Sequence, residues 1–464
     1  MIELSVAEIA RIVSGRIVSG DAETRISGLT TTDSREVRPG SVFVAKPGEV
    51  TDGFLFIPEA VRSGAALIIA ERETDVDVPL IVVDDTVAAL GDLAREVIAR
   101  VRALGTLRVV GITGSNGKTT TKNLLRAILS AEGPTVAPRG SFNNEVGAPV
   151  TFLEVTEQTH YLVAEMGASH VGDIDRLTRM APPDIGVVLK VGLAHAREFG
   201  GIERTFRAKS EMVTSLGADG VAVLNRDDDR VAQMAELTSA RVLWFGLDPS
   251  AHVRATDIRS DIEGTRFTLH IGEQEAQVRF RVIGEHHVSN ALAAAAVASE
   301  WGVPIERIVT ALESVELAER GRMQPLRGRG ITVIHDAYNA SPDSMAAALK
   351  TLASVKPEGG RTFAVLGAMS ELGDETGAAH DDIGIRAVRL RIDQVVAVGA
   401  DARRIHVSAV NEGAWNDESV HIVDHDEAFE WLIARLQPGD VVLVKASNSA
   451  GLHRLAERLG EWLS

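Results

Sequence analysis

The sequence predicts an α/β fold in three domains, the central one with a mostly parallel sheet. Two observations predict it. A chain of 464 residues is too long for a single hydrophobic core. Short apolar runs also alternate with helix-period segments along most of the chain, which is typical of parallel sheets covered by helices. We place the domains at residues 1–103, 104–317 and 318–464.

The first domain is predicted to be a small α/β unit. Strand patterns occur at Ser41–Ala45, Ala66–Ile69 and Leu80–Val83, and a helix pattern follows at Val87–Arg102. The N-terminal residues 1–13 have a helical period and two early acids. They lack the basic and then apolar regions of a secretory signal, so we expect no signal peptide.

The middle region is predicted to form a doubly wound sheet with a small antiparallel insertion. Its strand candidates are Leu107–Thr113, Tyr161–Met166, Ile185–Val191 and Val221–Asn225. Polar and apolar residues then alternate from Val253 to Val282, which favours antiparallel strands. Asn290 is a good N-cap for the alanine-rich helix that follows it, although a nucleotide-binding role is equally open.

The last domain is predicted to be a third α/β unit, with helices between short buried strands. The strand candidates are Ile331–His335, Phe363–Leu366, Val395–Val398 and Val441–Val444.

Composition excludes several classes of function. The net charge of −17, with no basic stripe to offset it, argues against nucleic acid as a partner. The absence of cysteine excludes disulfides, thiol catalysis and cysteine-bound zinc. No apolar run approaches the ~20 residues of a membrane span. We therefore expect a cytoplasmic protein.

The most informative segment is the run from Val109 to Thr121. An apolar strand leads into the turn Gly114–Ser115–Asn116–Gly117, then Lys118 and Thr119, and then a helix pattern. Such a turn presents backbone N–H groups and a helix N-terminus to phosphate, and the lysine adds a positive charge. Thr119 is placed to hold Mg²⁺. In the standard phosphate-binding loop, four residues separate the first glycine from the glycine before the lysine. Here five residues separate Gly111 from Gly117, and this spacing narrows the class of ATPase.

Polar residues at strand ends are the next candidates. Glu165 ends the strand beside the phosphate turn, where a carboxylate suits Mg²⁺. His195 follows the next strand, although an ordinary loop histidine is an open alternative. Lys209 is, from the sequence alone, a surface lysine on a helix-like segment.

Several polar clusters have both a structural and a binding interpretation. Asn143 and Asn144 lie in a turn whose residues are also common in plain loops. The segment His335–Asp343 either places Tyr338 for ring stacking or simply starts a capped helix at Ser341–Pro342. Arg35, beside Asp33 and Ser34, presents a fork suited to phosphate.

Together these segments resemble the Mur ligase family over essentially the whole chain. The matching motifs are Thr32–Arg35, Pro39–Gly40, Asp52–Gly53, Thr113–Thr119, Asn143–Glu145, Glu165–Gly167, Ala208–Lys209, Gly321–Arg322, Asp336–Met345, Glu371–Gly373 and Val444–Lys445. The Tyr338–Met345 run implies the member that adds D-alanyl-D-alanine to a UDP-N-acetylmuramoyl-tripeptide. The resemblance implies a UDP-binding domain, a central ATPase and a Rossmann-like C-terminal domain.

The resemblance also implies a role for each motif residue. The ATP-binding set is Gly114, Ser115, Asn116, Gly117, Lys118, Thr119, Thr120, Asn290, Arg322, Asp336, Tyr338 and Asn339. The catalytic set is Lys118, Glu165, His195 and Lys209, and Mg²⁺ would be held by Thr119, Glu165, His195 and the carbamate of Lys209. The UDP-sugar set is Ser34, Arg35, Asn143 and Asn144.

The expected reaction is amide formation driven by ATP, by a monomer with no nucleic-acid partner and no membrane insertion. Two alternatives stay open at this point. One is a sibling ligase that adds a single amino acid, or a folylpolyglutamate-type ligase. The other is a nucleotide-binding scaffold without catalysis.

Overall fold

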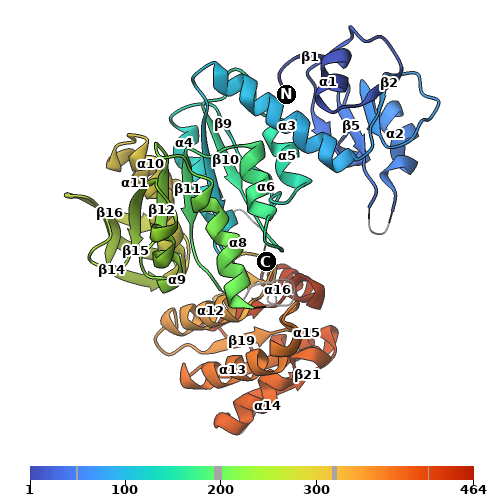
Figure 1. Cartoon of the computed structure of the whole chain (residues 1–464). Coiled ribbons are helices and arrows are strands. Elements are labelled where there is room, and N and C mark those ends of the chain that lie inside the picture. The colour runs from blue at the N-terminus through green and yellow to red at the C-terminus, as the bar shows by residue number, and fades with distance from the viewer. Residues whose placement is uncertain (49–50, 193–200, 316–320, 416) are drawn as a thin grey trace.

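The structure is a computed structural model that describes residues 1–48, 51–192, 201–315, 321–415 and 417–464 (Figure 1). These residues form three large sheets and one two-stranded ribbon. Figure 1 shows a central unit between an N-terminal unit, drawn in blue, and a C-terminal unit, drawn in orange and red. The largely parallel sheets and their helices confirm the predicted α/β class.

The N-terminal unit is built on a five-stranded sheet in which β2 alone pairs antiparallel. In spatial order its strands are β2 (Arg16–Ser19), β7 (Leu80–Val82), β6 (Leu67–Ala70), β5 (Val42–Ala45) and β4 (Thr30–Thr31). The remaining elements are the ribbon β1 (Leu4–Ser5) and β3 (Arg25–Ile26), with helices α1 (Val6–Ile12) and α2 (Ile57–Arg62). The three strands predicted here are confirmed to within one residue at each end.

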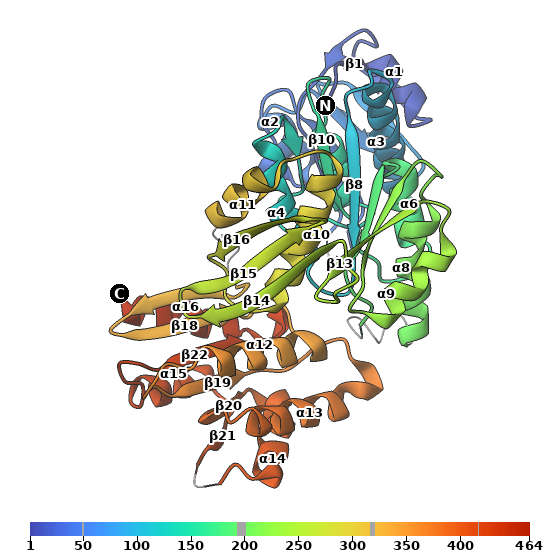
Figure 2. The same ribbon diagram turned by 90° about the vertical axis from the view of Figure 1, so that its left-hand side faces the viewer.

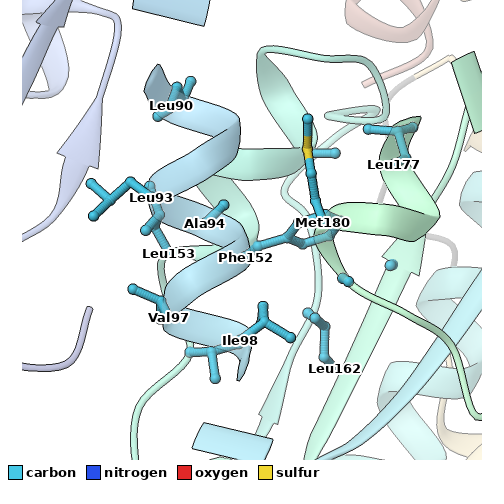
Figure 3. Close-up of a cluster of buried hydrophobic side chains, with 14 of the residues drawn as sticks. Leu90, Leu93, Ala94, Val97, Ile98, Phe152, Leu153, Leu162, Leu177 and Met180 are labelled. Carbon is cyan, nitrogen blue, oxygen red and sulfur yellow. The ribbon is translucent and has the colours of Figure 1, made fainter. Parts of the chain in front are cut away.

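Helix α3 (Thr86–Ala103) ties the N-terminal sheet to the central unit. It packs against α5 (Gly147–Phe152) and α6 (Asp173–Met180) as well as against β5. Figure 3 shows the side chains between these helices, among them Val97, Phe152 and Met180. Burying one such side chain contributes about 1.5–3 kcal/mol, so the contact holds the two units together. The helix predicted at Val87–Arg102 is confirmed.

The central unit is a nine-stranded sheet whose parallel part runs from β9 to β14. Its strands in spatial order are β16 (Gln274–Phe280), β15 (Gly264–Ile271), β14 (Val253–Asp261), β13 (Arg241–Gly246), β12 (Val221–Asn225), β11 (Ile185–Val188), β8 (Arg108–Thr113), β10 (Tyr161–Glu165) and β9 (Thr135–Val136). The helices are α4 (Lys118–Ser130), α8 (Ile202–Thr214), α9 (Asp229–Gln233), α10 (His286–Glu300) and α11 (Ile305–Ser314), besides α5 and α6. The antiparallel pairing of β14, β15 and β16 confirms the predicted insertion.

Two predictions for this unit are wrong in detail. Strand β11 ends at Val188 rather than Val191, because the chain turns toward the phosphate loop, where the backbone N–H of Ser115 donates to the carbonyl of Lys190 over 2.9 Å. Asn290 is not an N-cap, because helix α10 already begins at His286. Asn290 is therefore a residue within the helix, and its side chain is buried against the phosphate loop.

The C-terminal unit is a six-stranded sheet, parallel except for β17 at one edge. Its strands in spatial order are β17 (Gln324–Gly328), β18 (Ile331–Asp336), β22 (Val441–Lys445), β19 (Thr362–Leu366), β20 (Gln394–Val398) and β21 (Ser419–Ile422). The helices are α12 (Pro342–Ser354), α13 (Thr376–Arg389), α14 (Arg403–Glu412), α15 (His425–Ile433) and α16 (Leu452–Leu463). The four predicted strands are confirmed, whereas β17 and β21 were not predicted.

Helix α12 lies where the C-terminal unit meets the central one, near β14 (Figure 2). Ser341 caps this helix by accepting a hydrogen bond from the backbone N–H of Ser344, and Pro342 takes the first helical position, as predicted. The domain boundaries at 103/104 and 317/318 stay a prediction. None of the helices in the described part of the chain combines the length and apolarity needed to cross a membrane.

Candidate functional site

The phosphate loop follows β8 and ends at the N-terminus of α4. Gly114 (φ +152°) and Gly117 (φ +87°) have positive φ angles, which glycine adopts without a steric cost. A Cβ atom on Gly117 would collide with the side-chain oxygen of Asn290. No side chain caps α4, so the helix N-terminus presents its backbone donors to an anion.

Lys118 is the cation of this loop. Its Nζ donates to the carbonyl oxygen of Gly114 over 2.7 Å, which folds the side chain back over the loop. Burial lowers the pKa of Lys118, and the nearby charge of Glu165 opposes that shift. Negative phosphate oxygens at the loop would favour the charged form of the lysine in the same way.

Glu165 ends β10, which pairs in parallel with β8, so its carboxylate lies at the edge where the phosphate loop begins. Its Oε1 accepts hydrogen bonds from Asn143 Nδ2 (2.7 Å) and Thr119 Oγ1 (3.3 Å). Its Oε2 is buried and has no hydrogen-bond partner among the described residues. A buried carboxylate oxygen without a partner is costly. This donor set therefore fits a hard cation such as Mg²⁺, which prefers oxygen ligands.

Lys209 lies on α8 and is 3% exposed. Burial, together with the charge of Lys118, lowers its pKa to about 7. A large fraction of this amine is therefore neutral near pH 7, which is the form that reacts with electrophiles. His195 lies outside the described residues. Among those that are described, no three histidine or acidic side chains converge on a metal position.

The C-terminal unit contributes a buried ion pair at the ends of two neighbouring strands. Asp336 ends β18 and Lys445 ends β22, and the two are register partners. Lys445 Nζ donates to Asp336 Oδ2 over 2.6 Å and to the carbonyl of Asn339 over 3.0 Å. The second carboxylate oxygen of Asp336 accepts from the backbone N–H of Met323 over 3.1 Å. The pair fixes the turn that carries Tyr338 and Asn339.

Arg322 reaches from the C-terminal unit to the central one. Its guanidinium carbon lies 4.3 Å from the centroid of the Tyr338 ring, and its Nη2 donates to Ser141 Oγ over 3.1 Å. Stacking of this kind holds the planar group in place.

Two further contacts join the units at the same place. Ser341 Oγ donates to Asn116 Oδ1 over 3.2 Å, and Lys190 Nζ lies 3.3 Å from Asp343 Oδ1. Together with Arg322 they enclose a cavity of about 430 Å³ between the units.

This cavity brings together most of the residues predicted for ATP. Its lining includes Ser115, Asn116, Gly117, Lys118, Thr119, Thr120, Asn290, Arg322, Asp336, Tyr338 and Asn339, together with Glu165. Gly114 and Lys209 are not part of the lining. Asn143, which was predicted for the UDP-sugar, also lines this cavity, where its side-chain amide donates to Glu165.

The other residues predicted for the UDP-sugar lie apart from the cavity. Ser34 Oγ donates to Glu59 Oε2 over 3.1 Å in the N-terminal unit. Arg35 is exposed and forms a two-point ion pair with Asp33, with Nη2 2.6 Å from Oδ2. Asn144 Oδ1 accepts from the backbone N–H of Gly147 over 2.9 Å, which is the loop interpretation of that residue.

Sequence reasoning assigned no role to four residues of the cavity, although Asp343 and Lys445 lie in motifs that carry the resemblance. Lys190 lies in a predicted strand and Lys445 follows one, so the rule that pointed to Glu165 could have found them. Asp343 lies in the first turn of a predicted helix, and its partner lies in another domain. Ser141 gives no signal in the sequence, because it is one hydroxyl residue in an irregular loop.

Three family models match the chain in succession. The Mur ligase family catalytic domain matches residues 26–102, the Mur ligase middle domain 112–298, and the Mur ligase glutamate ligase domain 321–448. A UDP-N-acetylmuramoyl-tripeptide–D-alanyl-D-alanine ligase of Mycobacterium tuberculosis (strain ATCC 25618 / H37Rv) is 45% identical, over 99% of this chain and 98% of the relative.

Two solved structures show the same similarity. The crystal structure of MurF from Acinetobacter baumannii has a TM-score of 0.88 and 33% identity over 99% of both chains. The MurF ligase of Thermotoga maritima in complex with ADP has a TM-score of 0.82 and 31% identity, over 94% of this chain and 98% of that one. The chain belongs to the Mur ligase family.

Proposed function

From this family membership we propose that the protein is an ATP-dependent ligase that joins D-alanyl-D-alanine to UDP-N-acetylmuramoyl-tripeptide. The product is the UDP-N-acetylmuramoyl-pentapeptide of peptidoglycan synthesis. The observation that carries the proposal is the match over nearly the full length to relatives named for this reaction. The cavity between the central and C-terminal units supports it, because it combines a phosphate loop with a carboxylate suited to a cation.

ATP and Mg²⁺ are the proposed cosubstrate and cofactor. The phosphates would lie against the backbone donors of Gly114–Thr119 and the ammonium of Lys118. Mg²⁺ would be held by Thr119 and Glu165, with His195 and the carbamate of Lys209. When bound, the ion supplies positive charge beside the phosphate oxygens.

Lys209 is proposed to react with carbon dioxide. Its neutral amine attacks the carbon of CO₂, forms an N–C bond and loses a proton, which leaves a carbamate anion. The lowered pKa of Lys209 supports this step, because the neutral amine is the reactive form.

The proposed reaction needs no protein nucleophile. The tripeptide carboxylate attacks the γ-phosphorus of ATP, and ADP leaves. The amine of D-alanyl-D-alanine then attacks the resulting acyl phosphate, and phosphate leaves from the tetrahedral intermediate. The protein contributes position and charge. The nucleotide would lie between Lys118 of the central unit and the stacked side chains of Arg322 and Tyr338 of the C-terminal unit.

The UDP-sugar is proposed to bind near Ser34 and Arg35, with Asn143 and Asn144 at the central unit. Arg35 supports this because its planar guanidinium is exposed and its orientation is fixed by the ion pair with Asp33. The proposal also treats the protein as a monomer in the cytoplasm. Light scattering during gel filtration tests the monomer.

Phosphate release tests the reaction. Phosphate release is measured for the purified protein with Mg-ATP and UDP-N-acetylmuramoyl-tripeptide, with and without D-alanyl-D-alanine. The product is identified by mass spectrometry. Turnover that needs both substrates and yields a pentapeptide supports the proposal. Turnover with a single amino acid would instead assign the reaction of a sibling ligase. If the protein binds the nucleotide but turns over with no amine, a scaffold without catalysis is favoured.

A further inference from the structure

Lys122 is a buried lysine that the proposed reaction does not use. It lies on α4, one helical turn after Lys118, and is 1% exposed. Its Nζ donates to two backbone carbonyls, those of Pro138 (2.9 Å) and Gly140 (3.0 Å). Burying an ammonium group is expensive unless such bonds satisfy its donors, so this placement requires an explanation.

The two carbonyls belong to a segment without regular structure. Residues 137–146 lie between β9 and α5. Apart from a turn at Gly140 and Ser141, residues 138–142 belong to no helix or strand. The bonds from Lys122 therefore add to the few contacts that hold the backbone of this segment. They connect the segment to the helix that begins at the phosphate loop.

The same segment carries two polar side chains of the cavity. Ser141 Oγ lies 3.3 Å from Thr119 Oγ1 and accepts from Arg322, and Asn143 donates to Glu165. Ser141 follows Gly140 directly in the chain. A shift in the carbonyl of Gly140 would therefore move Ser141 directly. It would reach Asn143, whose carbonyl also accepts from the backbone N–H of Gly167 over 2.8 Å, through the residue between them.

We propose that Lys122 is a positioning residue that holds residues 138–143 in the conformation in which Ser141 and Asn143 orient Thr119 and Glu165 for a divalent cation. The inference rests on the proposed nucleotide and Mg²⁺ binding. Lys122 does not line the cavity, so it acts through the loop. Partners that orient metal ligands are typically worth a factor of 10 to 100 in metal affinity.

The test compares Lys122→Met with the unmodified protein. Methionine has a similar length and no donor. Binding of Mn²⁺ to the complex with ADP is followed by electron paramagnetic resonance, and binding of ADP without metal by calorimetry. We expect the Mn²⁺ dissociation constant to rise about tenfold and the metal-free ADP constant to change by less than about threefold. Arg126→Met is the matched control, since Arg126 is exposed on the same helix.

A combined variant separates positioning from general support of the fold. If Lys122 acts through Ser141 and Asn143, then Lys122→Met adds little to the loss of Mn²⁺ affinity caused by Ser141→Ala together with Asn143→Ala. If Lys122→Met does not fold, Lys122→Gln takes its place, because the amide can still donate to one carbonyl. That variant is expected to give an intermediate loss of about threefold.

Two results would overturn the inference. One is an unchanged Mn²⁺ affinity in a Lys122 variant, whatever happens to its melting temperature. The other is full additivity with the combined Ser141→Ala and Asn143→Ala changes. A failure of the proposed nucleotide and Mg²⁺ binding looks different, because the unmodified protein would then bind neither ADP nor Mn²⁺. A failure of the proposed ligase reaction alone would appear as binding of both without turnover.

Discussion

The buried amine of Lys209 predicts how the stability of this protein depends on pH. In the unfolded chain its pKa is that of an ordinary lysine, 10.5, and in the folded protein burial lowers it to about 7. Between these values the unfolded state binds about one more proton than the folded state. The free energy of unfolding must therefore rise with pH by up to about 1.4 kcal/mol per pH unit from this group. From pH 7.5 to 9.5 the contribution of Lys209 is about 2.5 kcal/mol.

The assay is urea unfolding of the unmodified protein and of Lys209→Met, at matched pH values in buffers free of bicarbonate. We expect the stability difference between the two to shift by about 2–3 kcal/mol over that interval, in favour of the unmodified protein at high pH. Lys350→Met is the control, since Lys350 is exposed and its removal leaves the slope unchanged. Parallel pH curves for the unmodified protein and Lys209→Met would refute the argument. Bicarbonate should further stabilise the unmodified protein and not Lys209→Met, because a carbamate forms only on the folded state.

Three further predictions concern the phosphate loop, the buried ion pair and the UDP-sugar site. Gly117→Ala places a methyl group against Asn290 at a φ of +87°, and calorimetry should show ADP affinity falling at least about tenfold, since the left-handed conformation alone costs about 1–2 kcal/mol. Asp336→Asn and Lys445→Met should each lower the free energy of unfolding in urea by about 3–5 kcal/mol. The double variant should lose clearly less than the sum of the two, because it leaves no unpaired buried charge. Full additivity would contradict this. Arg35→Ala should raise KM for the UDP-sugar substrate and leave the melting temperature unchanged, since the side chain is 83% exposed; an unchanged KM would remove Arg35 from the site.

The fold could be predicted from the sequence where local signals are strong. Buried strands of a parallel sheet are short apolar runs with clear ends, so Val221–Asn225 was found to the residue. Strands β17 and β21 were missed because they lie at the two edges of their sheet, where polar and apolar residues mix. The start of α10 was missed because Asn290 has the chemistry of a cap, whereas the first turn of the helix, from His286, consists of residues with only modest helix propensity.

The site was predictable only to the extent that each residue follows a local pattern. The phosphate loop and Glu165 both follow from one rule, that ligands collect at the carboxyl ends of parallel strands. Pairings across the chain have no such signal. Ser141 and Arg322 lie 181 positions apart, and their contact exists only once two units have packed together. The sequence showed which residues carry chemistry, and packing decided which of them meet.

The arrangement of charge explains why this site needs two units. The protein is strongly acidic, so a polyphosphate can bind only where the local charge is not negative. The C-terminal unit satisfies Asp336 internally with Lys445, and across the cavity Lys190 pairs with Asp343. Each of these two carboxylates, which line the cavity, is thereby paired with a lysine. Lys118 instead donates to a neutral carbonyl. Its ammonium thus has no carboxylate partner in that bond, and a phosphate can bind to it as a further negative charge beside Glu165.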